Sequence, residues 1–176
     1  GDTLLDDIAR HVVKERTGDN FIDGPFCHTV ITNDEKVTNA PGVDIPTIAL
    51  NRWPEGGWDR YHTDDDNPAA MNLDLMADVS EIYDDMFDIL QTNVYPRRKF
   101  KGPLFLSGIK LDFDWNSQPH IRRAMRDIIY NLEGGKSVFD LAVISGISYH
   151  NVRDAVRAMA AADLVELSPN PWSQHS

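Results

Sequence analysis

Cysteine is almost absent from this sequence, in which Cys27 is the only one among 176 residues. A single thiol cannot form an intrachain disulfide, and it excludes a zinc module built from several cysteines. The chain also lacks an apolar run close to the ~18 residues that a membrane helix needs. Its first residues, GDTLLDDIARHVV, lack the basic start and the apolar block of a signal peptide. These absences predict a cytoplasmic protein with no membrane-spanning segment.

Basic residues are scarce relative to acidic ones. Lysine and arginine number 17 against 28 aspartates and glutamates, which gives a formal net charge of -11 and a pI near 4.8. A surplus of carboxylates repels phosphate backbones, so a nucleic-acid role would require a local basic patch. A substrate with a positively charged end suits such a chain better. With 41% hydrophobic residues, the chain is long enough for one ordinary core or two small ones.

Hydrophobic periodicity predicts both helices and strands in the first half of the chain. A helix is expected over about 4–15, and a longer one over about 72–92 with one apolar face and one acidic face exposed to solvent. Two short segments are expected to be strands. These are CHTVI at 27–31 and the continuously apolar IPTIAL at 45–50, which would be buried on both faces. The apolar face of the long helix consists of Leu75, Met76, Val79, Ile82, Tyr83, Met86, Ile89 and Leu90.

A change in composition marks a domain boundary near YPRRKFKGP at 95–103, where basic residues cluster. Beyond it, the pattern predicts helices over 119–133, 137–145 and 148–162 and a strand at 164–167. Helix, helix, turn, helix, strand is the element order of a winged helix-turn-helix. The predicted organisation is an α/β domain, a linker, a winged helix-turn-helix domain and a tail, at 1–96, 97–118, 119–168 and 169–176.

The third of these helices decides whether the winged domain would read DNA. A recognition helix presents basic and amide side chains to base edges and phosphates. This one carries His150, Asn151, Arg153 and Arg157. It also carries the carboxylate Asp154, which opposes phosphate binding. The sequence therefore favours a packing or partner-docking role, including self-association through the winged helix, over DNA binding.

The stretch RYHTDDD at 60–66 is the candidate site of the first domain. A catalytic zinc site needs imidazole nitrogens and carboxylate oxygens that converge from several segments. His62 follows the predicted strand at 45–50, and ligands of α/β sheets usually bind at the carboxyl ends of strands. The alternative is an exposed acidic loop in which residues 66–68 start the next helix.

A longer stretch, TNDEKVTNAPGVDIPTIALNRWPEGGWDRYHTDDDNPAAM at 32–71, resembles the closing part of the co-catalytic two-zinc aminopeptidase superfamily. That family has a polar turn with an aspartate, a small-residue segment, an Ile-Pro-Thr strand and a Tyr-His-Thr-x-x-Asp loop. The matching residues are Asn33-Asp34-Glu35, Pro41-Gly42-Val43, Ile45-Pro46-Thr47 and Tyr61-His62-Thr63 with Asp66. The continuation KFKGPLFLSGIKL at 99–111, followed by a winged helix, is similar to a bacterial subgroup of this superfamily.

The resemblance implies an α/β fold, namely the last strands and helices of an α/β/α sandwich followed by the winged helix. It implies a hydrolase in which two zinc ions activate the water that removes N-terminal residues from peptides. His62 would be one zinc ligand. The side chains that would lie behind the ligands or at the rim of the substrate site are Tyr61, Asp66, Asp34 and Glu35.

In that family, the other zinc ligands and the catalytic base lie earlier in the sequence than the position that corresponds to residue 1 here. The present sequence contains no Glu-Glu pair to replace them. We therefore expect the C-terminal portion of a longer aminopeptidase-like protein, inactive without its N-terminal half. Its expected partners are that half and a peptide or amino-acyl substrate. The rival hypotheses are a non-catalytic interaction module of the same fold and, on charge the least favoured, a DNA-binding regulator.

Overall fold

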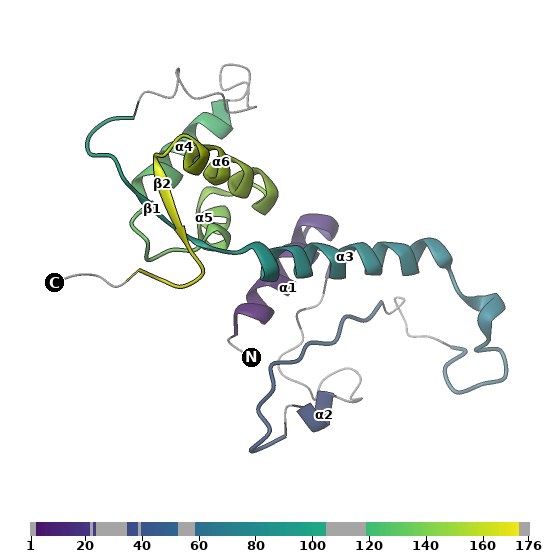
Figure 1. The fold of residues 1–176 in the computed structure, drawn as a ribbon. Coiled ribbons are helices and arrows are strands. Elements are labelled where there is room, and N and C mark those ends of the chain that lie inside the picture. The colour runs from purple at the N-terminus through teal and green to yellow at the C-terminus, as the bar shows by residue number, and fades with distance from the viewer. Residues whose placement is uncertain are drawn as a thin grey trace. The chain divides into compact units, whose positions relative to one another are not determined.

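The computed structural model describes residues 3–21, 23, 35–38, 40–52, 59–104 and 119–172. The chain divides into two compact units, residues 1–88 and 89–176 (Figure 1). Because residues 105–118 lie outside the described ranges, the predicted domains at 1–96 and 119–168 and the linker between them stay predictions. Within those ranges, no helix is long and apolar enough to cross a membrane.

The first unit begins with α1, Leu4–Thr17, where the sequence predicted a helix. Thr3 and Asp6 cap its start reciprocally, with the Asp6 carboxylate accepting from the Thr3 N–H at 3.0 Å. Burial raises the pKa of Asp6, but the hydrogen bonds from Thr3 together with nearby positive charge, including Arg10, leave this pKa below its usual value. The cap is therefore ionised at neutral pH. The buried side of α1 consists of Ile8, Ala9 and Val12.

Residues 45–50 form no strand, so the prediction of a buried strand there is wrong. The segment follows a short helix, α2 (Glu35–Thr38), and Ile45 is 53% exposed. A strand needs a neighbouring strand to pair its backbone, and none of the described residues of the first unit forms one. The strands expected of an α/β/α sandwich are thus missing from this part of the structure. The other predicted strand, at 27–31, lies outside the described residues.

The longest helix, α3, extends over Leu73–Thr92, close to the predicted 72–92. Asn72 caps it, because its side-chain oxygen accepts from the N–H groups of Asp74 at 3.0 Å and Leu75 at 3.2 Å. The predicted apolar face is covered over only part of its length. Leu75 at its start is 45% exposed. The buried members of the face are Ile82, Met86 and Ile89.

The second unit contains three helices and a two-stranded antiparallel sheet. The helices lie where the sequence predicted them, as α4 (Pro119–Tyr130), α5 (Val138–Ser145) and α6 (Tyr149–Ala161). Strand β2 (Val165–Ser168) was also predicted. Its partner β1 (Tyr95–Arg98) was not, because its basic residues indicated a boundary. In the register, Tyr95 lies opposite Ser168 and Arg98 opposite Val165.

Local chemistry explains where the helices of the second unit begin and end. Ser137 caps α5 in a reciprocal box with Asp140, whose carboxylate accepts from the Ser137 N–H at 2.7 Å. Gly146, in the left-handed conformation, ends α5. Ser148 directly precedes α6, but its side chain forms no capping hydrogen bond. The core between these helices includes Met125, Ile128, Leu132, Leu141, Tyr149, Val152, Val156 and Met159.

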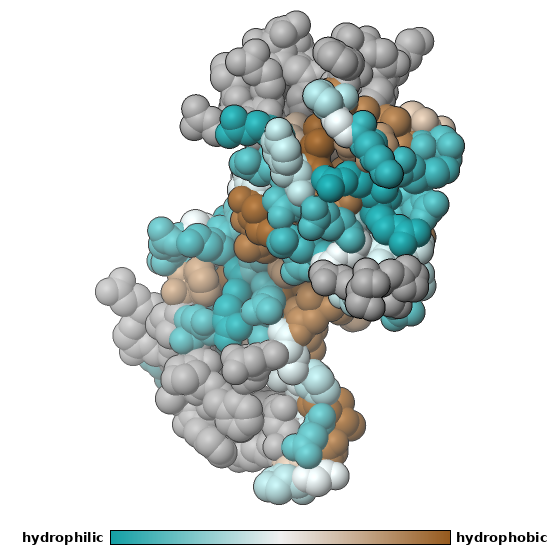
Figure 2. All heavy atoms as spheres, turned by 90° about the vertical axis from the view of Figure 1, so that its left-hand side faces the viewer, coloured by the Kyte–Doolittle hydropathy of each residue, from teal (hydrophilic) through white to brown (hydrophobic). Residues whose placement is uncertain are grey.

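One face of the molecule carries both polar and apolar side chains. Figure 2 shows hydrophilic side chains in teal with hydrophobic ones in brown between them. Two hydrophobic side chains near the end of α5, Val143 and Ile144, are 54% and 48% exposed. Single exposed apolar residues are ordinary on a protein surface, so these two alone indicate no binding site.

Candidate functional site

His62 occupies a tight turn in the loop before α3. Its φ is 62°, a left-handed conformation that few residues other than glycine adopt and in which histidine, asparagine and aspartate are enriched. The turn is closed by Arg60, whose carbonyl accepts from the Thr63 N–H at 3.0 Å and from the Thr63 hydroxyl at 2.7 Å. The rings of Tyr61 and His62 are 4.0 Å apart, with their planes inclined at 59°. Residues 59–69 are exposed, so the imidazole faces solvent.

Asn67 organises the acidic end of this loop. Its amide nitrogen donates to the carbonyls of Asp64 and Asp65, both at 3.3 Å, and its amide oxygen accepts from the Ala69 N–H at 3.1 Å. It thereby caps a 3-10 turn, η1 (Pro68–Ala70). The Asp66 N–H donates to the Thr63 carbonyl at 3.1 Å. The loop is thus ordered through its backbone, and its carboxylates stay exposed to solvent.

The structure describes only some of the side chains that we expected to lie beside His62. Tyr61 contacts the imidazole, and Asp66 belongs to the same loop. Asp34 lies outside the described residues, and of Glu35 only its backbone position, at the start of α2, is described. Sequence reasoning singled out this loop from its residue types alone. It gave no sign of the left-handed turn, which depends on the hydrogen bonds of Thr63.

A complete zinc site does not fit the described residues. A zinc ion takes four ligands, of which a catalytic site draws three from the protein. Across residues 3–21, 35–52, 59–104 and 119–172, less the gaps given above, no three histidine, cysteine or acidic side chains lie close enough to hold a metal ion. His62 could supply one ligand at most, so no catalytic step can be derived through a metal from this part of the chain.

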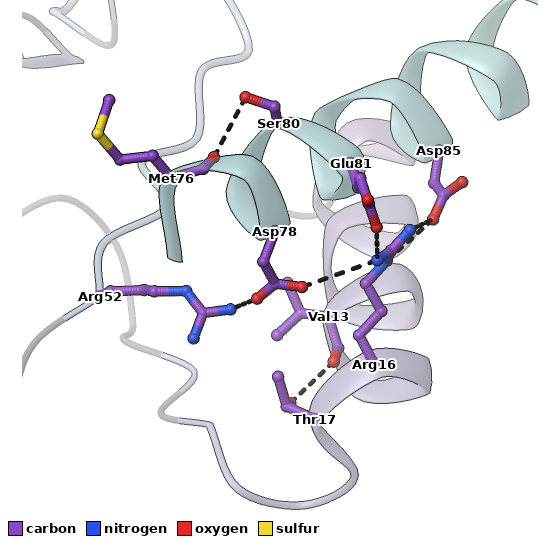
Figure 3. A network of polar contacts seen from close by, with 9 residues as sticks. All are labelled: Val13, Arg16, Thr17, Arg52, Met76, Asp78, Ser80, Glu81 and Asp85. Carbon is purple, nitrogen blue, oxygen red and sulfur yellow. Dashed lines mark hydrogen bonds and ion pairs between the residues drawn. The ribbon is translucent and has the colours of Figure 1, made fainter. Parts of the chain in front are cut away.

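An ion-pair network in the first unit was not predicted. The Arg16 guanidinium of α1 contacts three carboxylates of α3 (Figure 3). Its distances are 2.6 Å to Asp85, 2.8 Å to Glu81 and 3.8 Å to Asp78. Hydrogen bonds to Asp85 and Glu81 raise the pKa of Arg16 above its ordinary value. Asp78 also pairs with Arg52, so this carboxylate lies between two guanidinium groups.

The sequence contained a signal for this network. Asp78, Glu81 and Asp85 are spaced three and four residues apart, which places them on one side of α3. We expected the acidic face to be solvated; these carboxylates are exposed or partly exposed, and Arg16 in addition pairs with this side of the face. The arginine lies 62 positions before Asp78 in the sequence, so periodicity alone could not identify it.

Several described cations of the second unit form ion pairs with neighbouring acids. Arg97 of β1 pairs with Glu166 of β2 at 2.8 Å, and its guanidinium also lies 3.8 Å from the ring centroid of Trp172. On α6, Arg153 pairs with Asp154 at 2.9 Å. Arg157 is exposed and makes no ion pair within the described part of the chain. On α6, one arginine without an acid partner is a weak phosphate-binding surface.

Comparisons with known proteins point to peptidase-like relatives. Residues 1–93 match the family model described as "Domain of unknown function (DUF4910)". A curated relative from Clostridium acetobutylicum is named "Putative polysaccharide biosynthesis protein with aminopeptidase-like domain". It is 26% identical over 171 residues, which cover 95% of this chain and 38% of the relative. This chain therefore spans less than half of the relative's length.

A solved structure shares the fold. It is a crystal structure of a "putative peptidase" from Clostridium acetobutylicum, with a TM-score of 0.78 and 24% sequence identity. The match covers 96% of this chain and 37% of that chain. At this identity the likeness establishes the fold alone. The helices and the small antiparallel sheet described above therefore correspond to one part of that larger crystallised chain.

Proposed function

The chain belongs to the DUF4910 family, and from this membership we propose that it is the C-terminal portion of a zinc-dependent aminopeptidase-type hydrolase. The aminopeptidase-like and peptidase names of the two larger relatives support the proposal. The observation that carries it is His62, held by a hydrogen-bonded turn with its imidazole at the surface of the loop. In this proposal His62 is one ligand of a zinc site whose other ligands belong to polypeptide outside this chain. The 176 residues alone are then inactive.

The acidic loop has a second role in this proposal. Asp64, Asp65 and Asp66 are exposed carboxylates beside His62. The free ammonium group of a peptide substrate is attracted by the field of such carboxylates, whereas a blocked N-terminus is not. The loop therefore favours a substrate with a free N-terminus, which is the substrate class of an aminopeptidase.

The test is the zinc content of the polypeptide encoded by the complete reading frame. We expect His62→Gly to lose about one zinc ion per chain, because the imidazole ligand of the loop is removed. Glycine adopts a positive φ without strain, so the turn itself should persist. Elemental analysis after gel filtration measures the metal, and hydrolysis of an amino-acyl anilide measures activity.

His150→Ala is the matched control, because it removes a histidine from α6 and should leave zinc unchanged. The thermal midpoint of His62→Gly should stay close to that of the wild type. A large fall in this midpoint with zinc retained would make His62 a structural residue and would contradict the proposal.

A second candidate function is a non-catalytic interaction module of the same fold. The observation that favours it is that the described residues contain no group of three metal-ligating side chains. In this alternative the second unit is a winged helix-turn-helix that docks a protein partner. Its three helices, followed by a strand that pairs with β1, are compatible with that assignment. A complete reading-frame product without zinc and without peptidase activity would favour this alternative.

A further inference from the structure

The side chain of Trp172 fills a slot in the second unit. Its backbone N–H donates to the Gly134 carbonyl at 3.1 Å, and its indole N–H donates to the Tyr95 carbonyl at 2.9 Å. The guanidinium of Arg97 lies over the ring, 3.8 Å from its centroid. The slot therefore holds the indole by a hydrogen bond at its edge and by a cation–π contact at its face.

Gly134 gives the slot its shape. A Cβ built on this residue would lie 2.7 Å from the Cγ of Trp172, so a side chain at this position would occupy the space of the indole. Its φ of +84° also favours glycine over other residues. A backbone without a side chain thus leaves the slot open to a flat ring.

Each wall of the slot is held by a contact that does not involve Trp172. The Gly134 N–H donates to the Pro96 carbonyl at 3.0 Å. The Arg97 guanidinium is held by its ion pair with Glu166 at 2.8 Å, and β1, which carries both Pro96 and Arg97, pairs with β2. The slot should therefore keep its shape when the indole leaves it, as a preorganised binding site does.

Residues 169–172, which we call the latch, follow β2 and are attached mainly through Trp172. Residues 169–171 are exposed. Among the described residues their only hydrogen bond is local, from the Asn170 N–H to the Ser168 hydroxyl at 3.1 Å. Two of these residues are prolines, whose fixed φ reduces the entropy that the latch loses when it binds again. Release of the latch unfolds no helix or strand, so it is a local opening.

We propose that the slot is a binding site for a tryptophan-bearing peptide, occupied by Trp172 in the closed chain and opened when the latch detaches. The indole N–H explains the choice of tryptophan, since a phenylalanine ring has no donor for the Tyr95 carbonyl. A short tether keeps Trp172 at an effective concentration of about millimolar, so a partner's tryptophan must compete with it. The latch therefore closes the site against weak ligands. This inference is independent of the proposed hydrolase.

Peptide binding tests the site. The probe is a synthetic peptide with the sequence of residues 168–176, SPNPWSQHS, added to the isotope-labelled 176-residue chain, and the Arg97 amide signal in NMR spectra is the readout. We expect Trp172→Ala to bind this peptide with a Kd of about 1 mM or below, because its slot is empty. The wild type should bind at least about tenfold more weakly, because its slot is filled. Equal binding by the two chains, or no binding by Trp172→Ala, would overturn the proposal.

The choice of tryptophan is tested with a second peptide, in which phenylalanine replaces the tryptophan. This peptide keeps an aromatic ring for the Arg97 guanidinium but cannot donate to the Tyr95 carbonyl. We expect it to bind Trp172→Ala several-fold more weakly than the first peptide. Equal affinities for the two peptides would contradict the selection of tryptophan by the slot.

Two double variants show whether the peptide enters the slot. Gly134→Ala combined with Trp172→Ala puts a methyl group where the indole would lie and should abolish peptide binding. Gly102→Ala combined with Trp172→Ala is the matched control, because the φ of Gly102 is +85° and nothing lies within 4 Å of the added Cβ. Its affinity should equal that of Trp172→Ala. Equal affinities of the two double variants would show that the peptide binds elsewhere.

Hydrogen exchange in the wild-type chain tests the latch without any variant. NMR spectra follow the indole N–H of Trp172 separately from those of the other tryptophans. We expect this N–H to be protected at least about tenfold less than the slowest amides of α6, because the latch opens while the helices stay folded. Protection equal to that of α6 would mean that Trp172 leaves the slot only when the whole unit unfolds, and it would overturn the proposal.

Discussion

At the residue scale, Gly134 shows how one position can fix the sheet of the second unit. Its φ is +84°, and a Cβ built there would lie 2.7 Å from the Cγ of Trp172. The Gly134 N–H donates to the Pro96 carbonyl at 3.0 Å, and its carbonyl accepts from the Trp172 N–H at 3.1 Å. We expect Gly134→Ala to lower the free energy of unfolding by about 3 kcal/mol, from backbone strain and displacement of the indole. Urea titration measures the change.

Gly102→Ala is the matched control for this prediction. Its φ of +85° is nearly the same, but nothing lies within 4 Å of the added Cβ. It should therefore cost only the strain, about 1 kcal/mol. In a Trp172→Ala background, Gly134→Ala should approach the same small cost. Equal losses from the two glycine variants in the wild-type background would show that the indole contact has no role.

At the scale of elements, we expect Arg16→Ala to loosen the attachment of α1 to α3. Three carboxylates of α3 would lose their shared cation and repel one another. The ion pairs are largely exposed, so the loss in unfolding free energy should be about 1 kcal/mol and should shrink in about 1 M salt. Lys14→Ala, which removes a single exposed pair with Asp19, should change stability little. A loss that is insensitive to salt would point to packing of the arginine stem instead.

The helices and the strands differ in how far the sequence could predict them. A helix depends mainly on local hydrogen bonds, so its periodicity and some of its capping residues can be recognised in the sequence. This holds for the helical segments at 4–15, 72–92 and 148–162. A strand depends on a partner that local sequence does not supply. The segment at 45–50 therefore failed to form the predicted strand. Tyr95–Arg98 formed an unpredicted one, since the residues of β2 that pair with it lie 67 to 73 positions later in the sequence.

At the scale of the whole molecule, charge is divided unevenly between the two units. Residues 89–176 contain 11 basic and 8 acidic residues, against 6 and 20 in residues 1–88. This surplus of three cations could suggest nucleic-acid binding by the second unit. Several of its arginines are however paired with acids on their own unit, as Arg97 is with Glu166 and Arg153 with Asp154. A paired arginine releases few counterions on meeting a phosphate, so the surplus gives little binding energy.

We therefore expect the chain to bind duplex DNA only weakly. We expect the affinity to depend little on salt concentration. Fluorescence anisotropy with a labelled duplex of about 20 base pairs, between about 50 and 200 mM salt, measures both quantities. An Arg153→Ala/Arg157→Ala double variant should leave the signal unchanged, because Arg153 already has a carboxylate partner and Arg157 alone neutralises one phosphate. Binding that falls steeply with salt, and that this double variant weakens, would instead identify α6 as a DNA-binding helix. It would also reverse the preference for a protein-docking role in the second unit.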